Sequence, residues 1–205
     1  MTASRDDILN RLRKQSVPKT ALPDLQDAKL KAQWITYADP AQQFSEMLAS
    51  VGGECWRVKN IEEVNQRLTA LPVYQESKQI CSLVSHCGQP NVNVDEITDP
   101  HDFNDVDFAI LPGAFCVAEN GAVWITNDGG PQRTLYFLSQ HVALIVPASE
   151  IVPHMHAAYE RLSFENPSFG TFMSGPSKTA DIEQSLVIGA HGARSLTVCL
   201  VDEPF

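Results

Sequence analysis

Residues 174–179 carry side chains and backbone groups that suit anion binding. They read Ser-Gly-Pro-Ser-Lys-Thr and offer the hydroxyls of Ser177 and Thr179, the ammonium of Lys178 and the accessible amides around Gly175. Such a turn in front of a helix binds phosphate or carboxylate, because the first amides of a helix are unpaired and carry partial positive charge. The alternative is a capping turn in which a hydroxyl bonds the backbone and the lysine is solvated. The first interpretation predicts a small anionic ligand here.

A carboxylate and an imidazole follow this turn, at Asp181 and His191. In an Asp-His pair the carboxylate fixes the tautomer of the imidazole and raises its basicity, which suits the His for proton transfer. A lone His between glycines is also a common turn residue. The sequence leaves both interpretations open, and Asp181 and His191 are kept as candidate catalytic residues.

A further candidate catalytic residue is Glu119, within the sequence Ala-Glu-Asn-Gly-Ala of residues 118–122. Asn-Gly tolerates the positive φ angles of a tight hairpin turn, which places Glu119 and Gly121 in that turn. A glutamate in a desolvated cleft can act as a nucleophile in acyl transfer, since a covalent intermediate divides one difficult transfer into two easier ones. A solvated glutamate at an ordinary turn is the alternative. Downstream, Arg133 follows Gly-Gly-Pro and is a candidate for contacting an anion.

Apolar runs of strand length alternate with helical patterns along most of the chain. The alternation predicts an α/β fold, a three-layer sandwich with a mostly parallel central sheet and one hairpin. Because such sheets place ligands beyond the carboxyl ends of their strands, we expect residues 119–121, 128–133 and 174–192 to converge at that edge. The expected strands cover 54–58, 79–84, 106–113, the hairpin arms in 114–127, 141–147 and 195–201, and the expected helices cover 40–51, 61–71, a segment after Pro131, 151–162 and 180–190.

The chain divides by its sequence pattern into two parts. A short amphipathic helix around Ile8 is followed by a Pro-punctuated stretch at 16–32, which predicts an N-terminal helix and extended arm over residues 1–39. The remaining residues, 40–205, are expected to form a single α/β domain. A chain of 205 residues with 43% hydrophobic composition can bury one sizeable core.

Charge and hydropathy exclude some classes of partner. With 25 acidic and 15 basic side chains the formal charge is -10, and no Lys/Arg-rich block offers an electrostatic source of affinity for nucleic acid. No apolar run approaches the roughly 18 residues that would span a bilayer, and the N-terminal residues are charged. We therefore expect no nucleic acid, no membrane span and a cytoplasmic location.

The cysteines indicate buried thiols. There are five, an odd number, and they lie mostly in apolar strand-like runs, where free thiols behave as small hydrophobic groups. Iron–sulfur clusters and structural zinc sites use closely spaced thiolates, and the nearest pair here is Cys81 and Cys87. We expect neither an iron–sulfur cluster nor another metal site in this chain, and the residues identify no other cofactor.

The C-terminal part resembles a known family. Residues 174–183, with Gly189, His191 and Gly192 after them, resemble the signature of the LUD-domain family, and within it the lactate-utilisation protein C type. The family pattern there runs Ser-Gly-Pro-Ser-(Arg/Lys)-Thr-Ala-Asp-Ile-Glu and then Gly-x-His-Gly. The resemblance is specific over roughly residues 105–203.

A second family segment, Ala-Glu-Thr-Gly-Thr, resembles residues 118–122. Here Asn120 and Ala122 stand in place of the two threonines. The Arg and His that commonly follow this segment correspond to Arg133 and His141. With both hydroxyls lost, the resemblance does not imply that the ligand is the same as in the relatives.

The resemblance implies a fold and a role. The fold would be similar to that of the NagB/RpiA/CoA-transferase-like proteins. The role would be that of a cluster-free component of a system that oxidises L-lactate to pyruvate together with iron–sulfur partner proteins. Two alternatives stay open. One is a CoA-transferase-like enzyme using Glu119, because residues 118–121 resemble the Ser-Glu-Asn-Gly turn of such enzymes, and the other is a non-catalytic anion-binding regulatory module.

Overall fold

The computed structural model describes residues 2–15, 20–21, 24, 27–127, 131–162, 169–179, 187–189 and 192–205. By its contacts the chain forms two units, Met1–Trp34 and Ile35–Phe205.

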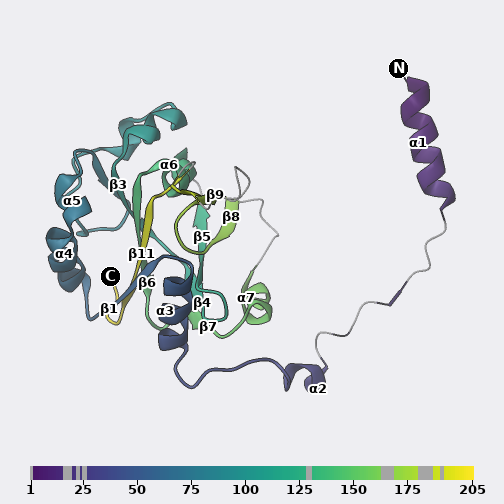
Figure 1. Cartoon of the computed structure of the whole chain (residues 1–205), viewed down its shortest axis with the longest axis horizontal. Helices are drawn as coiled ribbons and strands as arrows, with labels where there is room; N and C mark the ends of the chain where they lie inside the picture. Colours follow the sequence, from purple (N-terminus) through teal and green to yellow (C-terminus); the bar gives the residue numbers. More distant parts are fainter. Residues whose placement is uncertain are drawn as a thin grey trace. The chain divides into compact units, whose positions relative to one another are not determined.

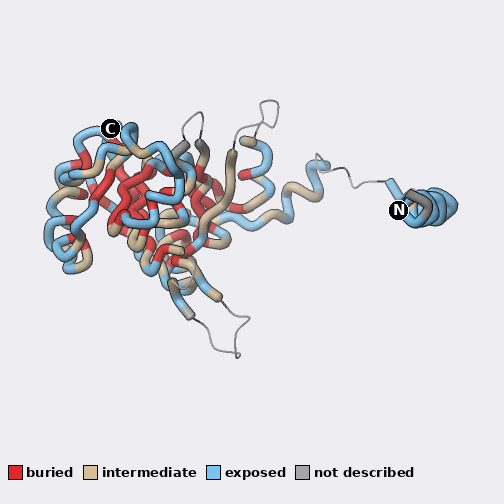
Figure 2. Tube along the Cα trace, turned by 90° about the horizontal axis from the view of Figure 1, so that it is seen from above, coloured by how far each residue is buried: buried red, intermediate tan, exposed pale blue. Residues whose placement is uncertain are grey.

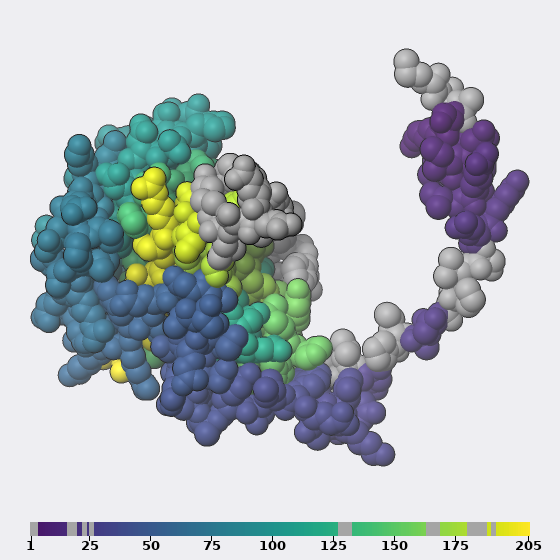
Figure 3. All heavy atoms as spheres, in the orientation of Figure 1, coloured from purple at the N-terminus to yellow at the C-terminus, as the bar shows by residue number. Residues whose placement is uncertain are grey.

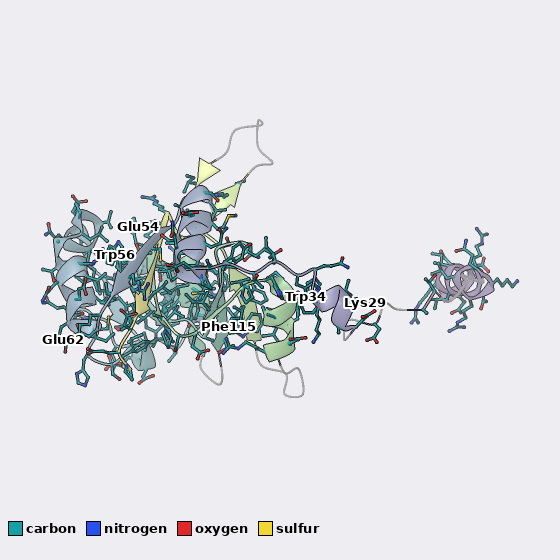
Figure 4. The ribbon with its side chains drawn as sticks, turned by 90° about the horizontal axis from the view of Figure 1, so that it is seen from below. Lys29, Trp34, Glu54, Trp56, Glu62 and Phe115 are labelled. Atoms are coloured by element: carbon teal, nitrogen blue, oxygen red, sulfur yellow. The ribbon has the colours of Figure 1, made fainter. Side chains whose placement is uncertain are left out.

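The first unit contains two helices among its described residues, α1 (Thr2–Lys14) and α2 (Ala28–Lys31). The short helix α2 lies where an extended arm is expected from the sequence. It forms because the Asp27 carboxylate accepts a hydrogen bond from the Lys29 amide at 2.8 Å and so caps the first turn. The Lys31 ammonium lies 5.5 Å from the centroid of the Trp34 ring. Lys29 and Trp34 are labelled in Figure 4.

A parallel sheet forms the centre of the second unit (Figure 1). Its middle strands are almost wholly apolar and buried, as strands covered on both faces must be. This confirms the predicted α/β fold with a parallel central sheet. In the described part of the chain the strand order is β1 (Glu54–Val58), β11 (Ser195–Val201), β6 (His141–Pro147), β3 (Phe108–Pro112) and β2 (Ile80–Ser82), all parallel.

Side chains of the central strands alternate between two hydrophobic clusters, one on each face of the sheet. On one face, Ile145 and its neighbours pack with α4 (Ile61–Ala70) and α5 (Pro72–Glu76). On the other face, Leu144 and its neighbours pack with α3 (Pro40–Ser50) and α6 (Leu135–Leu138). Figure 2 shows the buried residues, in red, concentrated in these strands.

Local contacts fix the ends of several elements. Helix α3 begins at Pro40 because the Asp39 carboxylate accepts from the amides of Ala41 and Gln42. In β1, the Trp56 indole donates to the Glu54 carboxylate at 2.7 Å, and both side chains are labelled in Figure 4 with Glu62 of α4. Short 3-10 helices cover Val94–Glu96, Pro100–Asp105 and Pro131–Thr134.

A second sheet was not predicted from the sequence as a separate layer. In the described residues its order is β7 (Ile151–Val152), β4 (Phe115–Val117), β5 (Ala122–Asn127) and β8 (Phe169–Met173). The antiparallel pair β4 and β5 confirms the predicted hairpin. The expected helix over 151–162 is wrong at its start, because Ile151 and Val152 pair with β4 and helix α7 spans only Met155–Arg161.

The helix expected over 180–190 is also wrong at its C-terminal end. Val187–Ile188 form strand β10, which pairs antiparallel with β9 (Lys178–Thr179). Val and Ile are β-branched residues that favour strands, and this preference prevails over the helical spacing of the apolar positions. Residues 180–186 lie outside the described residues.

Candidate functional site

The C-terminal half of α3 supports both glycine turns that the sequence singles out. Gly121 has a φ of 64°, and a Cβ atom there would lie 2.6 Å from the Leu48 amide nitrogen. Gly175 has a φ of 73°, and its Cβ would lie 2.7 Å from the Val51 carbonyl oxygen. Only glycine allows both the left-handed backbone and this close approach. The two turns are therefore held against adjacent parts of one helix.

The two turns also contact one another. The Ser174 hydroxyl donates a hydrogen bond to the Asn120 carbonyl oxygen at 2.8 Å. The Asn120 side chain in turn accepts from the Ala122 amide at 3.2 Å, which fixes the turn locally. Residues 119–121 and 174–175 thus lie side by side although more than fifty positions separate them in the sequence.

The Glu119 carboxylate is occupied by a structural contact. It accepts a hydrogen bond from the Met155 amide at 2.8 Å, at the first residue of α7. The Glu119 amide donates to the Pro153 carbonyl oxygen at 3.0 Å, so the residue holds the start of this helix from both backbone and side chain. Among the described residues no ion pair joins Glu119 to Lys178. The arrangement orients Glu119 toward α7.

The backbone of Ser177 bonds two later residues of the C-terminal motif, Gly189 and Ala193. Its amide donates to the Ala193 carbonyl oxygen and its carbonyl accepts from the Gly189 amide, both at 2.9 Å. A Cβ atom on Gly192 would lie 3.0 Å from the Ser177 Cβ and 3.2 Å from the Phe137 carbonyl oxygen. Ser177 is therefore in direct contact with the later part of the motif, at Gly189 and at Gly192 and Ala193.

Lys178 and Thr179 form strand β9, and the Lys178 side chain is exposed. The Lys178 Cε lies 4.0 Å from the position that a Cβ on Gly52 would take. In Figure 3, atoms of the C-terminal segment (yellow) reach the surface beside those of α3 and the residues after it (blue). Asp181 and His191, the other two candidates of this region, lie outside the described residues.

Arg133 lies near Ser177, to which it is linked through Phe169 and Phe137. Its guanidinium is 5.9 Å from the Phe169 ring centroid, and Phe169 meets Phe137 edge to face at 6.1 Å. Phe169 begins β8 and Met173 ends it, so the strand places roughly 13 Å between the Arg133 side and the Ser174 side. The predicted residues that the structure describes therefore fall into two groups, one around Ser177 and one around Asn120.

Residues 174–192 were expected beyond the carboxyl ends of the parallel strands, and for the residues described there this position is wrong. Ser177 bonds Ala193, which lies just before β11, and Lys178 lies near Gly52, just before β1. Both contacts are at the amino ends of strands in the central sheet. The physical reason is that these loops enter strands rather than leave them, a distinction that loop composition does not carry.

A cluster of polar side chains at the amino ends of the central strands was not predicted from the sequence. His141 and Ser195 are the first residues of β6 and β11, are paired in register, and their Nδ1 and Oγ atoms lie 2.7 Å apart. Burial lowers the pKa of His141, Arg194 lowers it further, and Asp107 opposes the shift. A signal was present, because Asp107, His141 and Ser195 each come directly before a run of buried apolar residues.

This edge is hollowed. A cavity of about 180 Å³ and an adjoining one of about 450 Å³ share the side chains of Asp107, Gln140 and Arg194. A further cavity of about 270 Å³ lies elsewhere, between α3 and β1. The smaller edge cavity is also lined by Val73, Glu76, Ser77 and His141, and the larger by Lys78, Gln79, Asn104 and Asp105.

The cysteines are free thiols held in the protonated form. Burial raises the pKa of Cys55 and Cys87 to about 11 and that of Cys81 to about 12. A thiol is a metal ligand and a nucleophile only as the thiolate, so these side chains act as small apolar groups near neutral pH. Across the described residues, no three His, Cys, Asp or Glu side chains are grouped as metal ligands.

Within the described parts of the chain, no helix combines the length and apolar character needed to cross a bilayer.

Comparison with solved structures supports the fold. The chain is similar to the crystal structure of a DUF162 family protein from Deinococcus radiodurans, with a TM-score of 0.59 and 17% identity. The match covers 82% of this chain and 99% of the other, and at this identity it concerns the fold alone.

Comparison with curated proteins finds relatives over part of the chain. "Lactate utilization protein C" of Oceanobacillus iheyensis is 33% identical over 42% of this chain and 40% of its own length. "Lactate utilization protein C 1" of Bacillus mycoides is 35% identical over 47% and 44%, and a Geobacillus sp. protein is 39% identical over 42% and 39%. The matched region thus spans less than half the length of these relatives. A model of the LUD domain matches residues 98–201, half of the chain, and so the chain belongs to the LUD domain family.

Proposed function

We propose that this protein is a component of a lactate-utilisation system, in which it acts with iron–sulfur partner proteins and carries no cluster itself. The observation that carries the proposal is the family match over 98–201 together with the similarity to proteins named lactate utilization protein C. That region includes both glycine turns and three adjacent strands of the central sheet, β3, β6 and β11. The shared part therefore contains both groups of candidate residues, whereas α3, which supports the glycine turns, lies before it in the chain.

The state of the thiols supports a role without an iron–sulfur cluster. Cys81 and Cys199 are fully buried, and burial raises the pKa of each thiol. Deprotonating these groups for ligation would place a charge in the apolar core, which is costly. A subunit of this kind leaves electron transfer to partner chains.

Growth of the source organism tests the proposal. Deletion of the gene is expected to abolish growth on L-lactate as sole carbon source and to leave growth on pyruvate unchanged, because only oxidation of lactate needs the system. The wild-type gene supplied in trans restores growth. Undiminished growth of the deletion strain on L-lactate would overturn the proposal.

Association with partners is tested separately. Affinity-tagged protein from lactate-grown cells is expected to copurify with chains that contain iron and acid-labile sulfide, measured by mass spectrometry and elemental analysis. Isolation without any such chain, under conditions in which the tagged protein restores growth, would overturn the partner part of the proposal.

A non-catalytic anion-binding module is the second candidate, and exposure of Lys178 beside Gly52 favours it. Phosphate or a small carboxylate is then expected to raise the melting temperature of the protein, and Lys178→Ala is expected to remove this effect. Lys59→Ala is the control, since Lys59 is exposed and faces Glu203 at 3.7 Å at the other end of β1. A shift that survives in Lys178→Ala excludes this turn as the anion site.

Acyl transfer through Glu119 has less support. Its carboxylate accepts the Met155 amide, which stabilises the charged oxygen and makes it a poorer nucleophile. Incubation with a panel of acyl-CoA compounds followed by borohydride is expected to leave Glu119 unmodified, as read by mass spectrometry. A borohydride-sensitive adduct on Glu119 would restore the enzyme hypothesis.

A further inference from the structure

The cavity at the amino edge of the central sheet is built on well-fixed backbone. The His141 amide donates to the Asp107 carbonyl oxygen at 2.9 Å, and the Arg194 amide donates to the Gln140 carbonyl oxygen at 2.7 Å. These bonds tie together the segments that enter β3, β6 and β11. Side chains that start on such segments keep their relative positions without a ligand, which is the condition for a preorganised site.

Opposite charges line this cavity without neutralising one another. Arg194 supplies a guanidinium to its lining, and Asp107 and Glu76 supply two carboxylates. Among the described residues none of these three forms an ion pair within 4 Å. Charged groups that share a concave surface but stay unpaired are available to a ligand, since only water competes for them.

Asp107 has one oxygen committed and one available. Its Oδ2 accepts hydrogen bonds from the amides of Lys78 at 2.8 Å and Gln79 at 2.9 Å. No hydrogen bond to its Oδ1 occurs among the described residues. The carboxylate is therefore held in place by the backbone and keeps an acceptor for a donor group inside the cavity.

His141 adds a polar group whose orientation is fixed. Its Nδ1 lies 2.7 Å from the Ser195 hydroxyl, and its ring stacks on Phe108 with the centroids 6.3 Å apart. With Nδ1 used in this way, Nε2 is the remaining nitrogen for a ligand. Arg194 and Asp107 line the same cavity as this imidazole.

We propose that this cavity binds a small zwitterion of the α-amino acid class, with its carboxylate on Arg194 and its ammonium on Asp107 and Glu76. A simple carboxylate would meet two like charges, and a simple amine would meet the guanidinium. A molecule that carries both charges on neighbouring atoms satisfies each side. The cavity is not lined by the residues of the Gly121 and Gly175 turns, although a Cβ on Gly189, whose amide bonds Ser177, would lie 2.4 Å from the Arg194 Cγ. The inference does not depend on the role in lactate utilisation.

The ligand test uses two molecules of nearly the same shape. L-alanine and L-lactate differ only in an ammonium against a hydroxyl, and propionate and ethylamine each carry one of the two charges. The purified protein is screened against the twenty L-amino acids and these three compounds by thermal shift and calorimetry. At least one amino acid is expected to bind and raise the melting temperature, whereas propionate, ethylamine and L-lactate at equal concentration are not.

Variants locate the binding. Arg194→Gln and Glu76→Gln are each expected to weaken binding of that amino acid about tenfold or more, because each removes a hydrogen-bonded charge. Arg57→Gln is the control, since Arg57 lies on β1 and faces Asp202 at 3.6 Å. Glu76 is exposed at the end of α5, so its substitution leaves the fold intact even if that of Arg194 does not.

Three results would overturn the proposal. They are the absence of binding by every amino acid, an equal effect of L-lactate or propionate, and unchanged affinity in Glu76→Gln. None of them bears on growth with L-lactate, so failure of this proposal is distinguishable from failure of the proposed function.

Discussion

The glycine turns on α3 and the cavity at the amino edge of the sheet make opposite use of their residues. At the turns, Gly121 and Gly175 allow close contact between backbone segments. The side chains of Glu119 and Ser174 form hydrogen bonds with the backbone of neighbouring segments. At the cavity, Arg194 and Glu76 carry charges that no described residue pairs. Dense sequence motifs can therefore mark close packing, whereas unpaired charges in a concave surface indicate a ligand. Substitutions at the turns and at the cavity test this difference.

Gly121→Ala should be the most damaging change at the turns. It forces an L-residue into a φ of 64° and places a methyl group 2.6 Å from backbone of α3, which is expected to cost about 3 kcal/mol of stability or more. Gly52→Ala is the matched control, with a φ of 85° but its nearest neighbour at 3.6 Å. That change should cost only about 1 kcal/mol. Urea unfolding measures both, and equal losses would show that packing on α3 is unimportant.

Glu119→Ala should remove one of two side-chain hydrogen bonds that, among the described residues, cap the start of α7, the other being to His154, and cost about 1 kcal/mol. Glu119→Gln keeps an acceptor oxygen for the Met155 amide and is expected to lose less than half as much. The comparison is again made by urea unfolding. If both variants are as stable as the wild type, the glutamate is free for another role and the distinction between the two regions weakens.

Ser174→Ala should cost slightly less, again about 1 kcal/mol at most, because the lost hydrogen bond between the two turns is exposed to solvent. Ser50→Ala serves as its control, since the Ser50 hydroxyl bonds the Met47 carbonyl within its own helix. Amide hydrogen exchange should report faster opening around Asn120 in Ser174→Ala and no change there in Ser50→Ala. Unaltered exchange at Asn120 in both variants would contradict the coupling of the turns.

At the cavity the smallest effect concerns pH. Unfolded His141 takes up a proton near pH 6.5, whereas the folded imidazole, half-buried and in the field of Arg194, does so only at lower pH. The unfolded state therefore binds more protons in this window, and stability falls as the pH drops from 6.5 toward the folded pKa. His141→Gln should flatten this part of the stability curve, measured by urea unfolding at a series of pH values.

A titration followed by NMR checks the cause of that shift. Arg194→Gln should raise the pKa of His141 toward its ordinary value, and Asp107→Asn should lower it, because the two charges act in opposite directions. A pKa that responds to neither substitution would leave burial as the sole cause and would place the two charges far from the imidazole.

The strands of the central sheet were predictable because each is a short run of apolar residues buried on both faces. The run 141–147 and the run 195–201 match β6 and β11 at both ends. Element type was harder to predict where short segments pair with distant ones. Ile151 lies on a helical stripe, yet it joins a sheet because β4 offers it a partner.

The candidate site was predictable only as local motifs. Gly121 and its hairpin were predictable, since Asn-Gly has a specific backbone preference. The contact of Ser174 with Asn120, and the cavity formed by Asp107 and Arg194, depend on strand order. The order of the strands in the sheet is set by tertiary packing, which cannot be predicted from a local pattern of residues. Asp181 and His191 remain predictions.

The position of β11 bears on how this protein is made in the cell. It lies between β1 and β6, and Glu54 pairs with Thr197, so β1 leaves the ribosome about 140 residues before its neighbour. Until then β1 and β6 present open edges, and nascent chains with unpaired edges are prone to aggregate. The central sheet therefore cannot close before β11 has been translated, and chaperones that shield strand edges should govern the yield of folded protein.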